Sequence, residues 1–252
     1  MKPTFLNHKE PLLTVMIQTK TPESAIETIR AASAEGADAF GLQVCRLDKQ
    51  YQNRETYERI FSELNGKPVY VTNYRYANNE GLSDDVLADG ILELARSGAT
   101  LCDIMGDIFC KHPEELTEDA EAVKKQIEFI DKLHAEGAEV LMSSHLFKYS
   151  PPERVLEIAL EQERRGADVV KIVTNALSPD EEIENLRATA MLKKELKVPF
   201  LFLSNHLHRV VGPYLGGCMW LCVHKHDELS TKSQLVLRKI KLIKDNFQCN
   251  IE

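Results

Sequence analysis

A lysine stands inside one of the most aliphatic segments of the chain. Residues 168–174 read Asp-Val-Val-Lys-Ile-Val-Thr, so β-branched side chains typical of a buried strand flank Lys171. An ammonium group in that setting costs free energy unless it has a partner or a function. A buried amine can be kept neutral, and a neutral amine attacks ketones to form an imine. Lys171 is therefore a candidate Schiff-base lysine, with a purely structural salt bridge as the alternative.

A histidine ends another apolar run. Residues 139–145 end in Ser-Ser-His, which would place the His145 imidazole at the same edge of a parallel sheet as Lys171. Imidazole exchanges protons near neutral pH, so we expect His145 to act as a general acid and base. Glu80 follows a third apolar run and could orient His145. The simpler alternative is that His145 only binds a loop.

Three arginines follow apolar runs in the same way. Arg46 stands at the end of the second run, Arg75 follows the third and Arg209 follows the seventh. Guanidinium groups bind carboxylates and other oxygen anions with two parallel hydrogen bonds. Taken singly, each arginine would more often be solvated or structural. Their shared position predicts a small-molecule anionic keto substrate.

The elements that must position these residues alternate between short apolar runs and longer amphipathic stretches, which indicates repeated βα units. The expected strands are residues 12–18, 39–47, 68–73, 101–106, 139–144, 168–174, 199–204 and 219–224. The expected helices are residues 22–34, 54–64, 84–96, 117–135, 152–165, 180–195 and 230–245, with one further weak helix.

Four Gly-Ala joints recur where a helix should pass into a strand, at residues 35–38, 97–100, 136–139 and 165–168. Glycine can adopt the left-handed conformation that ends a helix. Eight such units in 252 residues match an α/β (β/α)8 barrel. We therefore expect one barrel domain over residues 1–252, with no second domain.

Charge and cysteine usage restrict the partners. The formal net charge of −8 argues against binding nucleic acid, and no long apolar segment indicates a membrane span. The six cysteines include no CxxC pair, and no hydrophobic leader is visible at the N-terminus. We expect a cytoplasmic protein with no nucleic-acid or membrane partner.

Read together, these segments resemble type I 3-dehydroquinate dehydratases from about residue 12 to residue 243. The most specific likeness lies in residues 141–151, Leu-Met-Ser-Ser-His-Leu-Phe-Lys-Tyr-Ser-Pro, and residues 166–172, Gly-Ala-Asp-Val-Val-Lys-Ile. Glu80, directly before Gly81, occupies the place of the family's glutamate. The family's fold is the same barrel.

The resemblance implies a hydro-lyase of the shikimate pathway or of quinate metabolism. Lys171 would form the imine, His145 would remove the C2 proton and help to expel the C1 hydroxyl, and Glu80 would orient His145. The substrate-binding residues would be Arg46, Arg75, Arg209, Ser230 and Gln234. The family's chemistry needs no cofactor and no metal, and a homodimer is expected.

Several recognition positions depart from the family pattern. Val44 stands where the family has a glutamate, residues 204–209 form a shorter loop, and Lys232 interrupts the closing motif. A related Schiff-base lyase or aldolase, acting on another cyclic or polyhydroxy ketone, is therefore an alternative.

Two further classes remain open. Histidines paired at alternate positions, His206 with His208 and His224 with His226, could belong to a metal-dependent barrel enzyme. The altered recognition residues would also fit a non-catalytic binding paralogue. Retention of Lys171, His145 and Glu80 argues against the latter, because simple binding does not need all three.

Overall fold

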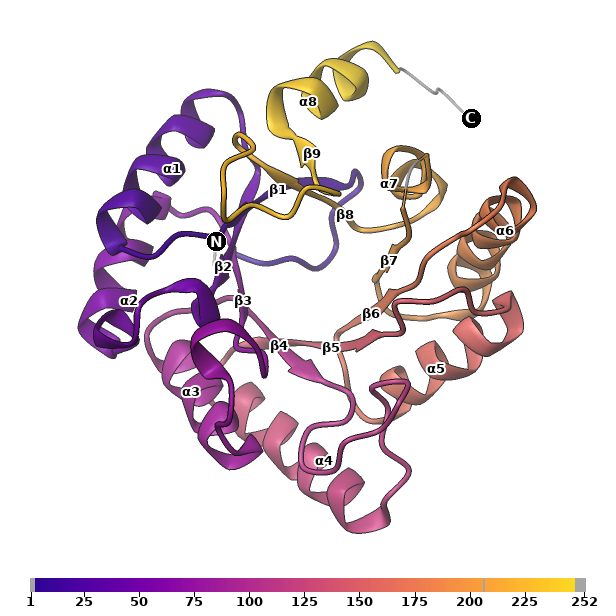
Figure 1. The fold of residues 1–252 in the computed structure, drawn as a ribbon, viewed down its shortest axis with the longest axis horizontal. Helices are drawn as coiled ribbons and strands as arrows, with labels where there is room; N and C mark the ends of the chain where they lie inside the picture. Colours follow the sequence, from indigo (N-terminus) through magenta and orange to yellow (C-terminus); the bar gives the residue numbers. More distant parts are fainter. Residues whose placement is uncertain (1–2, 206, 248–252) are drawn as a thin grey trace.

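A computed structural model of the chain describes residues 3–205 and 207–247. Parallel strands form a curled wall, and helices surround it (Figure 1). The wall runs in the order β7-β6-β5-β4-β3-β2-β1-β8-β9. A backbone hydrogen bond of 2.8 Å, from Cys218 N directly before β8 to Phe200 O on β7, closes the seam. This is the expected (β/α)8 barrel.

The strands match the predicted runs closely. They are β1 (Leu12–Ile17), β2 (Ala39–Gln43), β3 (Val69–Thr72), β4 (Leu101–Met105), β5 (Glu139–His145), β6 (Val169–Val173), β7 (Phe200–Leu203), β8 (Met219–Val223) and the short β9 (Leu235–Val236).

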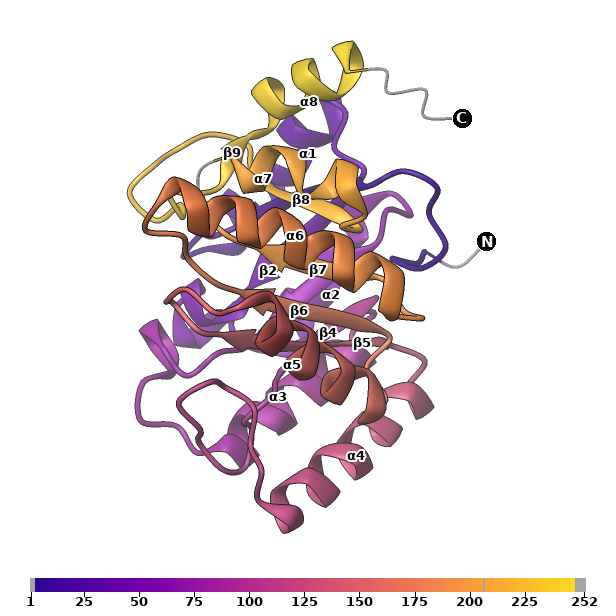
Figure 2. The same cartoon turned by 90° about the vertical axis from the view of Figure 1, so that its right-hand side faces the viewer.

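The helices pack around the outside of this wall, as Figure 2 shows from the side. They are α1 (Pro22–Ala34), α2 (Arg54–Phe61), α3 (Asp84–Arg96), α4 (Ala120–Ala135), α5 (Pro152–Arg164), α6 (Pro179–Glu195), α7 (His208–Val211) and α8 (Leu237–Asn246). Polar side chains begin many of them; Ser83, for example, accepts a hydrogen bond from Val86 N at the start of α3.

Two predicted boundaries differ from the structure by four residues or more. The helix expected from residue 230 begins at Leu237, because Ser230 and Asp227 bond to each other's backbone and hold the preceding residues in a loop. β2 ends at Gln43, and the turn η1 (Val44–Arg46) follows it. Arg46 therefore leaves the sheet at a turn.

The apolar core has two layers. One fills the space between the strands and the helices, and the other fills the barrel. Strands β1 to β8 all contribute to the inner layer, with Tyr70, Leu101, Leu141 and Val169 among its members. Because side chains alternate along a strand, Lys171 points inward with Val169.

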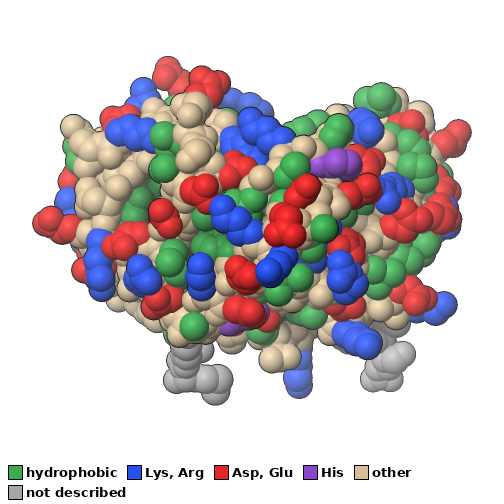
Figure 3. All heavy atoms as spheres, turned by 90° about the horizontal axis from the view of Figure 1, so that it is seen from below, with side chains coloured by type: hydrophobic (Ala, Val, Ile, Leu, Met, Phe, Trp, Pro, Cys, Tyr) green, Lys and Arg blue, Asp and Glu red, His purple; other side chains and the backbone are tan. Residues whose placement is uncertain are grey.

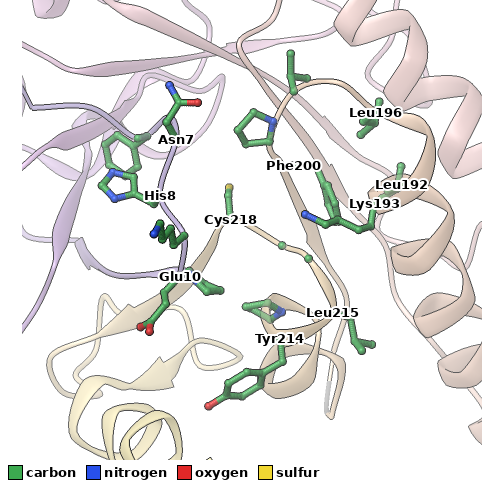
Figure 4. A pocket seen from close by; sticks show the side chains of 18 of the residues that line it. Asn7, His8, Glu10, Leu192, Lys193, Leu196, Phe200, Tyr214, Leu215 and Cys218 are labelled. Atoms are coloured by element: carbon green, nitrogen blue, oxygen red, sulfur yellow. The ribbon is translucent and has the colours of Figure 1, made fainter. Parts of the chain in front are cut away.

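Two cavities lie at opposite ends of the strands. One, at the carboxyl ends, has a volume of about 620 Å³ and contains Lys171 and His145. The other, at the amino ends of β7, β8 and β1, is lined by the N-terminal segment, Lys193 and Cys218 (Figure 4). Barrel enzymes place their chemistry at the carboxyl ends, which favours the first cavity.

The surface shows charges of both signs. On the face drawn in Figure 3, Lys and Arg side chains are interspersed with Asp and Glu. Within the described residues, no helix is long and apolar enough to cross a membrane. Five cysteines there have free thiols, and Cys45, Cys102 and Cys222 are buried; Cys249 lies outside the described residues.

Candidate active site

Lys171 is held by three oxygen atoms. Its Nζ lies 2.6 Å from the Tyr74 hydroxyl, 2.9 Å from the Tyr70 hydroxyl and 3.0 Å from Asp103 Oδ2. An ammonium group has three protons to donate, so these partners satisfy all of them. Lys171 is 4% exposed and still lines the cavity. The amine is thus both anchored and within reach of a ligand.

Asp103 is the centre of this cluster. Its side chain is fully buried, and it forms the ion pair with Lys171. Tyr70 and Tyr74 donate their phenolic protons to its Oδ2, and Ser143 Oγ donates to Oδ1 at 2.6 Å. Four donors compensate the cost of burying the carboxylate. Burial and the adjacent Asp103 charge raise the pKa of both phenols well above its ordinary value.

The strand register explains why these residues meet. Asp103 on β4 pairs with Leu141 on β5, and Ser143 pairs with Lys171 on β6. Side chains that alternate along adjacent parallel strands form layers inside a barrel. Asp103, Ser143 and Lys171 therefore occupy adjoining positions, and Tyr70 on β3 completes the layer.

His145 lies above this layer, at the end of β5. Its ring packs edge-on against Tyr74, with 5.2 Å between ring centroids. Phe147 stacks on it at 5.6 Å. The imidazole is partly buried and lines the same cavity as Lys171. Adjacent strands thus bring an imidazole and an amine to one cavity.

Glu115, rather than Glu80, contacts the imidazole. Glu115 Oε2 lies 2.7 Å from His145 Nδ1 and accepts the His145 backbone N–H at 2.9 Å. Glu80 is exposed, and the structure gives its side chain no contact with His145. The predicted pairing of Glu80 with His145 is therefore wrong, because η4 (Ala77–Asn79) turns the chain outward before Glu80.

The loop between β4 and α4 is shaped to deliver Glu115. Glu115 has a φ of 44°, and its carbonyl accepts a 2.8 Å hydrogen bond from Ser144 Oγ. A Cβ on Gly106 would lie 2.5 Å from that same carbonyl oxygen, so glycine is required there. Arg165 reaches under the loop and donates to Gly106 O and Thr117 O. This framework fixes the Glu115 carboxylate below His145.

The three predicted arginines all line the cavity, but they differ in their partners. Arg75 binds both oxygens of Asp84 and also Asp107. These hydrogen bonds raise its pKa although burial opposes the shift. Arg75 therefore ties together the segments after β3 and β4, and its guanidinium is already neutralised.

Arg46 and Arg209 form no ion pair within the part of the chain that the structure describes. The Nε of each is buried and has no hydrogen-bond partner there. Burial lowers the pKa of Arg209 to about 10. Partly buried cations without counter-ions are costly, so these two groups are well suited to an anionic ligand.

The loop that contains Ser230 and Gln234 contributes other residues to the cavity than the sequence predicted. Gln234 lines the cavity, and its buried Oε1 has no partner among the described residues. Ser230 does not line this cavity; it binds Asp227 instead. Thr231 and Ser233 line the cavity in its place. The assignment of Ser230 to the site is therefore wrong, because the Asp227 turn holds its hydroxyl away.

The described histidines of the predicted pairs each contact a different group. His208 contacts Thr189, His224 contacts Glu35 and His226 contacts the Gln234 carbonyl. His206 lies outside the described residues. Among residues 3–205 and 207–247, no three His, Cys, Asp or Glu side chains form a group that could hold a metal ion.

Sequence reasoning missed Asp103, Tyr70 and Tyr74. A signal for Asp103 was present, since it interrupts the apolar run 101–105 as Lys171 interrupts 168–174. The tyrosines carry no such signal, because aromatic residues are ordinary in buried strands. Glu115 lies in an irregular loop, where no periodicity predicts its direction.

Comparison with known proteins assigns the chain to a family. A model of the type I 3-dehydroquinase family matches residues 13–243. A 3-dehydroquinate dehydratase of Klebsiella pneumoniae subsp. pneumoniae is 26% identical over 248 residues, which cover 94% of this chain and 93% of that protein. One from Pyrococcus abyssi is 48% identical over 52 residues, 20% of this chain and 24% of that protein.

Solved structures show the same fold. The type I 3-dehydroquinate dehydratase of Clostridium difficile, described with covalently modified comenic acid, aligns with a TM-score of 0.79 at 17% identity, over 95% of this chain and 93% of that one. The 3-dehydroquinate dehydratase of Enterococcus faecalis aligns with a TM-score of 0.78 at 17% identity, over 97% and 98% of the two chains. Because the family model spans nearly the whole barrel, the chain belongs to the type I 3-dehydroquinase family.

Proposed function

We propose that the protein dehydrates 3-dehydroquinate to 3-dehydroshikimate through an imine at Lys171. The observation that carries this proposal is the shared cavity of Lys171 and His145, in which the amine is anchored by three oxygens and the imidazole by Glu115. A lysine that only served packing would not need an adjoining proton-transfer group. Family membership supports the same reaction class, a hydro-lyase.

The reaction divides between the two groups. Lys171 Nζ bonds to the ketone carbon, and the resulting iminium draws electrons from the neighbouring C2–H bond. His145 takes the C2 proton, the electron pair forms the C1–C2 double bond, and the C1 hydroxyl leaves as water with a proton returned by the imidazole. Glu115 holds Nδ1, so that the other imidazole nitrogen is free to face the substrate. Water then releases the product ketone from Lys171.

The two unpaired arginines supply the recognition in this proposal. Arg209 and Arg46 would bind the substrate carboxylate or its hydroxyl groups, and Gln234 would add a hydrogen bond through its free Oε1. Arg75 would act by holding the two loops that frame the cavity. The chemistry uses only groups of the protein and needs no cofactor.

A second candidate is a Schiff-base lyase or aldolase for a different cyclic or polyhydroxy ketone. One observation favours it: Gln43, which lines the cavity, is bound to Gln18 at 2.7 Å, and the adjacent Val44, where the family has a glutamate, is buried in the apolar core. A substrate with a different hydroxyl pattern would suit this wall. A homodimer remains a prediction, which light scattering would test.

The experiment follows enone formation by ultraviolet absorbance, with purified protein and 3-dehydroquinate. Wild-type protein should produce the enone, and Lys171→Met should produce none, because no imine can form. His145→Ala should still form the imine with the ketone but should release no enone. Turnover by Lys171→Met would refute the proposed mechanism. An adduct without enone in the wild-type protein would favour the second candidate.

A further inference from the structure

The two phenols beside Lys171 have no part in the steps described so far. Tyr74 Oη is the nearest of the three partners of Nζ, at 2.6 Å, and it also donates to Asp103. Tyr70 Oη contacts the same two groups, at 2.9 Å from Nζ. Hydroxyl groups that touch both a reacting nitrogen and a buried carboxylate are placed to move protons.

The two tyrosines differ in their access to the cavity. Both rings line it, but Tyr74 is 8% exposed and Tyr70 is fully buried. Tyr74 also lies edge-on to His145, the group that faces the substrate. A ketone oxygen that approached Nζ from the cavity would therefore meet Tyr74 before Tyr70.

We infer that Tyr74 is a catalytic residue that carries protons from Lys171 Nζ to the ketone oxygen while the imine forms. This inference rests on the proposed imine mechanism. Asp103 stays a carboxylate throughout and balances first the ammonium and then the iminium. Tyr70 holds Nζ in place between Tyr74 and Asp103.

The proton balance requires such a carrier. Between ammonium and iminium, the nitrogen loses two protons, and the ketone oxygen gains two and leaves as water. The N–C bond forms after the first transfer, and the C–O bond breaks with the second. In each transfer the Tyr74 hydroxyl turns its proton from Asp103 to the ketone oxygen and gives it up there while it accepts a proton from Nζ, so the phenol is restored.

The surroundings of Tyr74 favour this relay over a free tyrosinate. Burial and the Asp103 charge raise its pKa, so the phenol stays protonated between transfers. Release of its proton must then coincide with uptake from Nζ. The contact of 2.6 Å permits this exchange without movement of the backbone.

The test measures imine formation apart from elimination. The product, 3-dehydroshikimate, retains the ketone and can form the imine at Lys171 without loss of a C2 proton. Protein would be mixed with this ketone, quenched with borohydride at successive times, and the Lys171 adduct measured by intact mass. Tyr74→Phe removes the proposed carrier, and Tyr70→Phe is the matched control because it removes a hydroxyl with the same two partners.

Tyr74→Phe should slow adduct formation about 100-fold, and Tyr70→Phe less than about tenfold. Equal rates for Tyr74→Phe and wild type, or equal slowing in both variants, would overturn the inference. In wild-type protein, imine formation should also be slower in deuterium oxide than in water, and equal rates in the two solvents would overturn the inference even if Tyr74→Phe failed to fold. Absence of any wild-type adduct would instead overturn the proposed function itself.

Discussion

Replacing Glu115 with glutamine should impair catalysis while leaving the fold intact. The Glu115 carboxylate accepts two hydrogen bonds from His145, at 2.7 and 2.9 Å, and its side chain is 25% exposed. A hydrogen bond to a charged group contributes about 1.5 to 3 kcal/mol, and about 1.4 kcal/mol corresponds to a tenfold change in rate. If the bond to Nδ1 matters mainly when the imidazole carries the transferred proton, kcat should fall roughly 10- to 150-fold.

The assay is steady-state dehydration of 3-dehydroquinate, with thermal unfolding as the check on folding. Glu80→Gln is the matched control, since it makes the same chemical change at an exposed side chain, and its kcat should stay within about twofold of wild type. A large loss in Glu80→Gln together with normal turnover in Glu115→Gln would refute this reasoning.

Three further perturbations have defined outcomes. Arg209→Ala or Arg46→Ala should each raise KM about tenfold or more, because each removes an unpaired cation from the cavity wall; an unchanged KM in both would count against an anionic substrate. Gly106→Ala should lower kcat, because its Cβ would displace the Glu115 carbonyl; normal kcat would show that the loop can move without loss. Burial lowers the pKa of His208 to about 4 from 6.5, so its neutral form stabilises the folded state above pH 6.5. That stabilisation, about 3 kcal/mol, should be lost as the pH falls from 6.5 to 4, and a His208→Gln variant measured by urea unfolding should show a weaker pH dependence.

Part of the barrel interior was predictable from sequence, although the tyrosines around Lys171 were not. Lys171 is recognisable as a charge among β-branched residues, and the order of strands then places His145 beside it. Both inferences use only the local composition and the order of the strands along the chain, and neither depends on the path of a loop. The same logic applied to the run 101–105 would have identified Asp103.

The loops at the carboxyl ends of the strands were less predictable, because the path of a loop depends on contacts between distant segments. Glu115 reaches His145 only through the turn at Gly106 and the support of Arg165, which lies 59 residues from Gly106 in the chain. Ser230 was assigned to the site from a motif, but its hydroxyl is captured by Asp227 three residues away. A motif preserves spacing along the chain, whereas a turn decides the direction of a side chain.

Formation of a covalent imine at Lys171 is the central claim, and borohydride trapping tests it most directly. Protein incubated with 3-dehydroquinate would be reduced, and the modified residue would be identified by peptide mass mapping. We predict one adduct per chain, located on Lys171, with enone released in the unreduced reaction. Enone formation without an adduct, or an adduct on another lysine, would contradict the mechanism.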